Sequence, residues 1–294
     1  MASMTSVQKQ SPHSLDTLIT PEGAHFFSYL RSLLGFRELL SFLVWKQLKV
    51  QVAQTVLGFG WLVLRPVLNV LVLTVVFGRL ARMPSEGNPY LLFLLSGFLP
   101  WSYFSGVVGR SVSSLTGNAA LVTKVYFPRL LLPGALILAG LSEFFVTFIF
   151  FMLVSVLQYG HFPGFGLLLM LVPLLLLMVT TAAVSFWLAA LAVNYRDVRQ
   201  AASYLLQMLM FLAPVIWPLS LLSQRMGSFA DAWLLKLLAA LYPMVGVVEG
   251  FRRALLGGPM PWDLLGIGFI TATMLLVTGL MYFHHCERQM ADGI

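Results

Sequence analysis

Six long apolar runs constrain the fold of this chain more than any other feature of its sequence. Four of them hold no charged residue, and a fifth holds only Glu143. The sixth contains Arg65-Pro66 near its start, where an arginine can reach the lipid headgroups and a proline is tolerated in a first helical turn. A helix needs about 20 apolar residues to cross a membrane. The runs therefore predict an all-α membrane protein with six membrane-spanning helices, over residues 61–77, 89–109, 130–158, 165–193, 201–222 and 264–283.

The composition agrees with a membrane protein and argues against a nucleic-acid-binding one. Of the 294 residues, 59% are hydrophobic and 10% are charged, and the mean hydropathy is +0.87. A soluble domain has about 25% charged residues. The net charge of +7 comes from cations that lie singly between apolar runs. This spacing suits anchoring at a lipid surface rather than a nucleic-acid footprint, so membrane lipid is an expected partner and nucleic acid is not.

The distribution of lysine and arginine predicts the orientation in the membrane. With six spans, both termini lie on the same side. Twelve of the 18 lysine and arginine residues then fall on the side of the termini. The positive-inside rule places that side, and both termini, in the cytoplasm. The other six cations are Arg79, Arg82, Arg225, Lys236, Arg252 and Arg253.

Two apolar segments are too short or too polar to cross a membrane. In residues 38–55, Trp45, Leu48 and Val52 share one helical face while lysine and glutamine occupy the other, which predicts an amphipathic helix in the cytosolic interface. The external segment 237–248 is about half a membrane thick and contains a proline and a glycine. It predicts a short re-entrant or interfacial helical hairpin between spans five and six.

The chain divides into three parts. Residues 1–35 are expected to form a mobile cytosolic N-terminal extension, because serine, glutamine, threonine, proline and histidine dominate its start and no apolar segment of a signal peptide follows Lys9. Residues 36–285 form the transmembrane domain, and residues 286–294 form a cytosolic tail.

The residue patterns of most catalytic and metal sites are missing. There is no phosphate-binding P-loop and no nucleophile elbow, and the five histidines and Cys286 form no spaced ligand set. We therefore expect no catalytic residue, metal or cofactor in this chain, which then forms a pathway whose energy comes from elsewhere. An ion-coupled carrier or a membrane enzyme is the alternative class. Glu143 is the one candidate for a proton relay, but a carboxyl hydrogen-bonded between helices, or kept protonated, is favoured because a relay needs partners.

Seven segments in order resemble a known family. They are the amphipathic helix followed by QTVLGFGWLVLRPVLNVLVLTVVFGRLA (54–81), YLLFLLSGFLPWSYFS (90–105), NAALVTKVYFPRLLLP (118–133), NYRDVRQ (194–200), APVIWPLS (213–220) and YPMVGVVEGFRRALLG (242–257). Together they resemble the membrane-spanning permease of ABC-2 type exporters, in the branch that exports lipid-linked polysaccharides. The similarity covers about residues 36–285.

This resemblance implies a function and its partners. The chain would be a homodimeric permease in a bacterial inner membrane, paired with two copies of a separate ATPase that binds the ATP and magnesium. O-antigen is the favoured cargo. Capsular polysaccharide, teichoic acid and a small hydrophobic compound are alternatives within the same architecture.

The resemblance also implies that residues 118–133 form a coupling helix in a cleft of the ATPase. Asn118 and Pro128 can bound such a short piece. The alternative is a plain intracellular turn. The candidate coupling residues are Asn118, Leu121, Val122, Lys124, Tyr126, Phe127, Pro128 and Arg129.

Two further clusters gain roles from the resemblance. Tyr195, Arg196, Asp197 and Arg199 are the candidates for a second cytosolic contact, with the ATPase or with the amphipathic helix. The alternatives are local pairing of the charges and a solvated loop. Pro243, Glu249 and Arg252 belong to an external gate. Glu249 and Arg252 are three residues apart, so one helical turn lets them pair, and as an exposed pair they would contribute well under ~1 kcal/mol.

Aromatic residues make up 13% of the chain and suggest a lining for the transported glycan. Sugar rings present apolar C–H faces that can slide along aromatic rings. Packing between helices, or contact with lipid, is the alternative for each of them. The candidate path residues are Trp61, Phe98, Trp101, Tyr103, Phe104 and Trp217.

Overall fold

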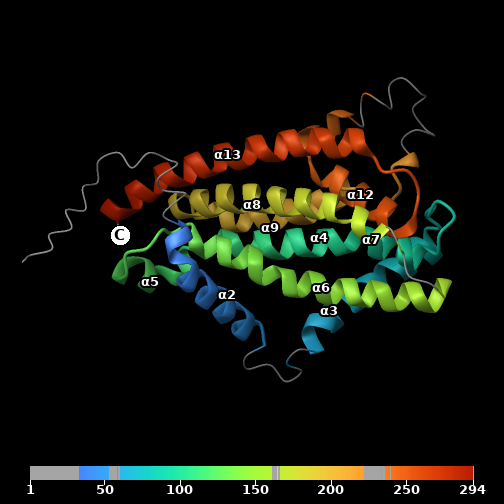
Figure 1. The fold of residues 1–294 in the computed structure, drawn as a ribbon, viewed down its shortest axis with the longest axis horizontal. Coiled ribbons are helices and arrows are strands. Elements are labelled where there is room, and N and C mark those ends of the chain that lie inside the picture. Colours follow the sequence, from blue (N-terminus) through green and yellow to red (C-terminus); the bar gives the residue numbers. More distant parts are fainter. Residues whose placement is uncertain are drawn as a thin grey trace, which may run out of the picture.

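The protein, described here from a computed structural model, is built around a bundle of long helices that run alongside one another (Figure 1). The structure describes residues 33–52, 58, 60–160, 164, 166–221, 233, 236–238 and 240–293. Within these residues all regular secondary structure is helical, which confirms the predicted all-α class. The expected N-terminal extension lies outside the described residues up to residue 32.

Five helices of the described part are long and apolar enough to cross a membrane. Four of them coincide with a predicted run to within a few residues, and the fifth, α13 (Trp262–Gly293), continues past its run, which ends at residue 283. Pro66 lies well inside the first of them rather than in its first turn, because that helix begins at Gly60. The five are α3 with η2 (Gly60–Leu73 and Thr74–Leu80), α4 (Tyr90–Val112), α6 (Leu131–Tyr159), α7 with α8 (Gly166–Leu169 and Leu171–Asn194) and α13 (Trp262–Gly293).

The run predicted as span 201–222 has a different structure. Helix α9 begins earlier, at Asp197, and ends at Leu212. Pro214 explains the early end, because proline disfavours the helical conformation of the residue before it, and Ala213 is extended at φ −69° and ψ 138°. At 1.5 Å per residue the helix is about 24 Å long, shorter than the ~30 Å hydrocarbon layer. The six-span count therefore stays a prediction.

The predicted amphipathic segment is helical as α2 (Arg37–Val52). It packs on α6, with Leu43 buried, while Phe42 and Trp45 are more than half exposed. Lys49 lies 4.4 Å from the Trp45 ring centroid. An exposed aromatic pair beside a lysine is typical of an interfacial helix, and the position of α2 at the membrane surface remains a prediction.

The second half of the predicted external hairpin begins α12 (Met244–Leu256). Its 13 residues give a length of about 20 Å, which is too short to cross a membrane. Helix α12 packs against α4, α7, α8 and α13, and most of its side chains are buried. A short helix thus lies inside the bundle between the fifth and sixth predicted spans.

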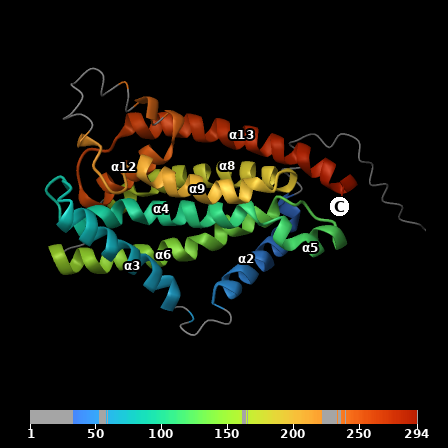
Figure 2. The same ribbon diagram turned by 180° about the vertical axis from the view of Figure 1, so that it is seen from behind.

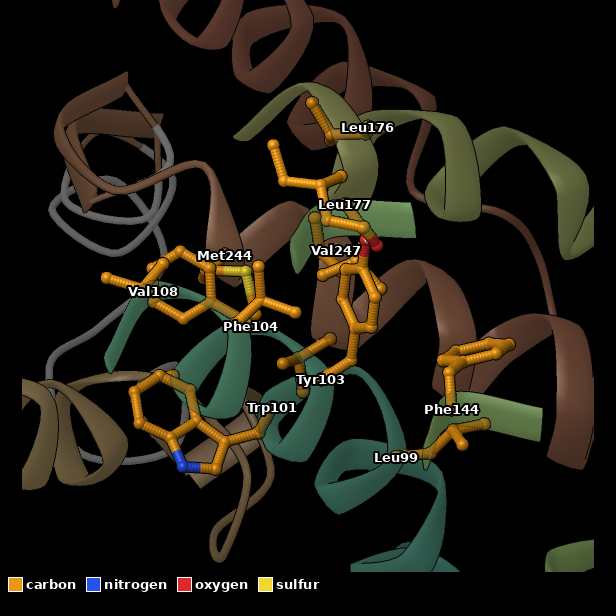
Figure 3. Close-up of a cluster of buried hydrophobic side chains, with 14 of the residues drawn as sticks. Leu99, Trp101, Tyr103, Phe104, Val108, Phe144, Leu176, Leu177, Met244 and Val247 are labelled. Atoms are coloured by element: carbon orange, nitrogen blue, oxygen red, sulfur yellow. The ribbon is translucent and has the colours of Figure 1, made fainter. Parts of the chain in front are cut away.

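Helix α4 forms the centre of the bundle. It contacts α6, α8, α9 and α12, and its middle residues are almost fully buried. Figure 3 shows part of this core, where Leu99, Tyr103 and Phe104 of α4 meet Leu176 and Leu177 of α8 and Met244 and Val247 of α12. The bundle is therefore organised around one buried helix.

Gly140 of α6 allows α6 to approach α4 closely. A Cβ atom at this position would collide with Val107 and would lie 3.2 Å from the ring of Tyr103. A Cβ at Gly134, six residues earlier on the same helix, would meet no atom within 4 Å. The two glycines are thus a matched pair that differs in the space around them.

We expect Gly140→Ala to lower the free energy of unfolding by about 1–3 kcal/mol, because overpacking forces neighbouring side chains to shift. Gly134→Ala should instead raise it by up to ~1 kcal/mol, because alanine favours a helix more than glycine does. Thermal unfolding of both variants in detergent measures the difference. Equal midpoints would contradict close packing at Gly140.

The two ends of the bundle carry different elements. Both views place α5 (Ala119–Lys124) and the C-terminal end of α13 at one end and α12 at the other (Figures 1 and 2), and Figure 1 places α7 beside α12. Helix α13 continues to Gly293, so residues 286–293 of the predicted tail extend the last helix.

Candidate functional site

A groove of about 870 Å³ opens along α2, α3, α4, α6 and α9. Three of the predicted path residues, Trp61, Phe98 and Trp101, line it. The Trp61 side chain is 37% exposed, whereas Phe98 and Trp101 are largely buried and contribute only part of their surface to the wall. Polar residues also line this groove, namely Gln51, Arg65, Asn69, Ser102, Ser105, Arg110, Glu143 and Thr147.

The other predicted path residues do not line this groove. Tyr103 and Phe104 are buried in the core around α4 (Figure 3). The Tyr103 hydroxyl donates to the Ile137 carbonyl at 2.9 Å, which ties α4 to α6. The Trp217 indole donates to the Phe211 carbonyl at 3.0 Å, beyond the end of α9. Adjacent positions on α4 thus have different roles, because successive side chains point about 100° apart around a helix.

An ion pair joins α4 and α6 at the wall of the groove. Arg110 Nη1 and Nη2 donate to Glu143 Oε1 and Oε2 at 2.6 and 3.2 Å. Such two-pronged contacts are the strongest type of side-chain hydrogen bond. The interpretation of Glu143 as a carboxyl hydrogen-bonded between helices is therefore confirmed. Its partner was not predicted, because the two residues are 33 positions apart.

The predicted pair at the other end of the bundle is confirmed, but it is not exposed. Arg252 Nη1 lies 3.0 Å from Glu249 Oε2, and each side chain is less than 5% exposed. Glu249 also accepts from Arg253 Nε at 2.8 Å, and Arg253 pairs with Glu86 at 3.1 Å. These residues form a network that connects α12 with the loop before α4.

Arg252 has further partners on two other elements. Its Nη2 donates to the Pro214 carbonyl at 2.7 Å, and its guanidinium carbon lies 3.9 Å from the Phe93 ring centroid on α4. Burial lowers the pKa of the Arg252 guanidinium from its ordinary value, and Glu249 opposes this shift. Pro243 directly precedes α12. A single buried cation thus holds α12, α4 and the segment after α9 together.

The predicted coupling segment has a buried side and an exposed side. Val122, Phe127 and Pro128 are buried in the chain's own core, and Leu121 is half-buried. Lys124 is exposed, and Tyr126 is 83% exposed. The aromatic side chain available to another molecule is therefore Tyr126 and not Phe127.

The coupling segment is tied to α2 and α13. Lys46 Nζ of α2 donates to Asn118 Oδ1 at 3.1 Å. The backbone N–H of Arg129 donates to Glu287 Oε1 of α13 at 2.7 Å. The segment also leads directly into α6, which begins at Leu131. A movement of the coupling segment would therefore be transmitted to α2, α6 and α13.

The second predicted cytosolic cluster lies at the same end of the bundle. Tyr195 and Arg196 lie at the turn between α8 and α9, Asp197 and Arg199 lie in the first turn of α9, and all four are exposed. Val112 at the end of α4 packs with Ala192 of α8 and Ala202 of α9, which places this turn beside the helix that leads to the coupling segment. The two clusters thus share one end of the bundle.

The similarity to known proteins covers nearly the whole chain. The O-antigen export system permease protein RfbA of Myxococcus xanthus is 33% identical over 267 residues, which is 90% of this chain and 98% of that protein. A protein of the same name from Klebsiella pneumoniae is 23% identical over 87% of this chain and 94% of its own length. The polysialic acid transport protein KpsM of Escherichia coli is 22% identical over 72% of this chain and 79% of its own length.

The model of the ABC-2 type transporter family matches residues 38–256. This range includes the groove, the coupling segment and α12. The match covers well over half of the chain and agrees with the relatives above, so the chain belongs to the ABC-2 type transporter family.

Proposed function

We propose that this chain is the permease subunit of an exporter that moves lipid-linked O-antigen across the bacterial inner membrane. The observation that carries the proposal is the 33% identity to an O-antigen export permease over 98% of that protein's length. The 870 Å³ groove, which combines aromatic and polar walls, suits such a cargo. ATP hydrolysis on a separate subunit drives the movement, because this chain has no phosphate-binding P-loop.

The active form in this proposal is a homodimer of six-span subunits with two ATPase subunits. Helix α9 and the segment after it form the fifth span, and both termini lie in the cytoplasm. The exposed face of the coupling segment, with Lys124 and Tyr126, contacts the ATPase. Tyr195 and its neighbours add a second contact at the same end of the bundle.

Helix α12 lies at the opposite end and closes the external mouth. Its buried charge network supports this role, because the network connects α12 both to α4 and to the segment that follows α9. A gate built in this way moves as a unit with the elements to which it is tied.

Deletion of the gene in its host tests the proposal. We expect the surface O-antigen to disappear while the lipid-linked glycan accumulates inside the cell, and we expect the wild-type gene to restore export. Immunoblots of intact and lysed cells measure the two pools. An unchanged surface glycan together with increased sensitivity to hydrophobic drugs would assign the permease to a small hydrophobic cargo. Loss of a capsule with the O-antigen intact would instead identify a capsular polysaccharide as the cargo.

A further inference from the structure

The groove is lined not only by aromatic rings but also by a cluster of side chains that can form hydrogen bonds. Arg110 and Glu143 lie in its wall with Ser102 and Ser105 of α4 and Thr147 of α6. The side chains of the ion pair are 34% and 27% exposed, so both face the open space as well as each other. We call these five residues the polar station.

The hydroxyl groups of the polar station already use their protons. Ser102 donates to the Leu99 carbonyl, Ser105 donates to the Trp101 carbonyl, and Thr147 donates to the Glu143 carbonyl, at 2.9–3.0 Å. A hydroxyl oxygen that has donated its proton can still accept hydrogen bonds. The three hydroxyls therefore present acceptors to a ligand in the groove.

The ion pair adds further acceptors and a few donors. The carboxylate oxygens of Glu143 each have a lone pair beyond the one that Arg110 uses. Arg110 Nη1 and Nη2 each keep one N–H group beyond the one that Glu143 accepts. Asn69 of α3 can both donate and accept on the facing wall. The station thus offers mostly acceptors and has one cation, which its own anion neutralises.

This pattern distinguishes between ligand classes. A phosphate group only accepts hydrogen bonds, so at the polar station it would face acceptors and a neutralised arginine, and the groove's other cation, Arg65, lies outside the station. A hydrocarbon chain would displace water from the remaining lone pairs and N–H groups of the station without replacing those hydrogen bonds, which is costly. A sugar ring carries hydroxyls that donate and accept, and it has an apolar face for the exposed ring of Trp61. The polar station together with Trp61 therefore matches an uncharged, hydroxyl-rich ligand.

We infer that the polar station binds the sugar hydroxyls of the glycan chain as it passes through the groove. This inference rests on the proposed function and specifies which part of the cargo the site holds. The cavity lies within the ~300–1,000 Å³ range of ligand sites, and both α3 and α4 line it with aromatic and polar residues. Arg65 lies at the groove with its guanidinium carbon 5.8 Å from the Trp61 ring centroid, outside the station.

A double variant separates ligand binding from simple bracing of α4 against α6. Replacing a partly buried ion pair with apolar residues of similar size often preserves stability. We therefore expect Arg110→Met with Glu143→Met to insert and fold, and to lower export of surface glycan about fivefold or more, the effect of losing hydrogen bonds to the ligand. The charge-swapped control, Arg110→Glu with Glu143→Arg, keeps donors and acceptors and should export better than the methionine pair. Wild-type export by the methionine pair would overturn the inference.

Cysteine labelling tests the inference without removing the ion pair. Cys286 is the only cysteine and is buried, so the wild-type protein supplies the background. Ser105→Cys places a thiol in the station, and Ser113→Cys places one at the exposed end of α4 as the control. Maleimide labelling is compared in three strains: one that makes the full glycan, one that is blocked before chain elongation, and one without the lipid carrier.

We expect labelling of the Ser105→Cys variant to be at least about threefold slower only in the strain that makes the full glycan, as for a thiol covered by a bound ligand. The Ser113→Cys variant should be labelled at the same rate in all three strains. Protection of the station thiol by the unelongated lipid carrier would assign the station to the carrier's phosphate groups and overturn the inference. Equal labelling in all strains would also overturn it, while the deletion result above would still support the exporter. Failure of the proposed function is recognised separately, because the deletion strain would then keep its surface glycan.

Discussion

Replacing Glu249 with leucine is expected to lower the free energy of unfolding by about 3 kcal/mol, because it leaves Arg252 charged and buried without its carboxylate. Arg252 is 2% exposed, and the carbonyl of Pro214 and the ring of Phe93 compensate only in part. For a chain of this size the thermal midpoint should fall by about 6–12 °C. Fluorescence-detected gel filtration of heated, detergent-solubilised protein measures the shift.

Two controls show whether the buried pair is responsible. Glu86→Gln removes only the outer partner of Arg253, in a pair with partly exposed side chains, and should cost up to ~1 kcal/mol. Glu249→Leu combined with Arg252→Met removes both buried charges and should recover much of the lost stability. A Glu249→Leu protein as stable as the wild type would mean that the network contributes little to the position of α12.

The membrane-spanning helices follow closely from the sequence because an apolar run is a local property. Five of the six predicted runs form helices, four of them with nearly the same bounds, while α13 continues past its run to Gly293. The exception is residues 201–222, where mean hydropathy does not register the effect of Pro214. The apolar run continues past that proline, but the helix ends at Leu212. Reading Pro214 as a break would have predicted the shorter helix.

The candidate site shows the same difference between local and distant relations. The Glu249–Arg252 pair was predictable because residues three apart are neighbours on a helix, whereas its burial depends on four other elements. The Arg110–Glu143 pair joins two helices whose relative position no local pattern specifies. The sequence alone also could not show that Tyr126 is exposed and Phe127 is buried, because which of two adjacent aromatic residues packs in the core depends on the tertiary structure.

That difference makes Tyr126 the residue with which to test coupling. Tyr126→Asp places a charge on a side chain that is 83% exposed, so folding should be unaffected. If the ATPase docks here, the charge enters an apolar contact, and we expect export of surface glycan to fall at least about tenfold, as for the loss of a binding hot spot. Surface glycan and co-purification with the ATPase subunit are the two measurements.

Phe127→Asp is the comparison variant, because it introduces the same charge at a buried aromatic residue instead of an exposed one. Its side chain is 5% exposed, so a carboxylate there is buried in the core and should destabilise the protein by several kcal/mol, about what an unpaired buried polar group costs. Trp262→Asp, at an exposed aromatic on the first residue of α13, controls for the added charge at the opposite end of the bundle. Coupling through this surface requires that only Tyr126→Asp loses export while keeping a wild-type thermal midpoint. If Tyr126→Asp exports normally, the segment is an intracellular turn, and the ATPase must act on the exposed cluster around Tyr195 instead.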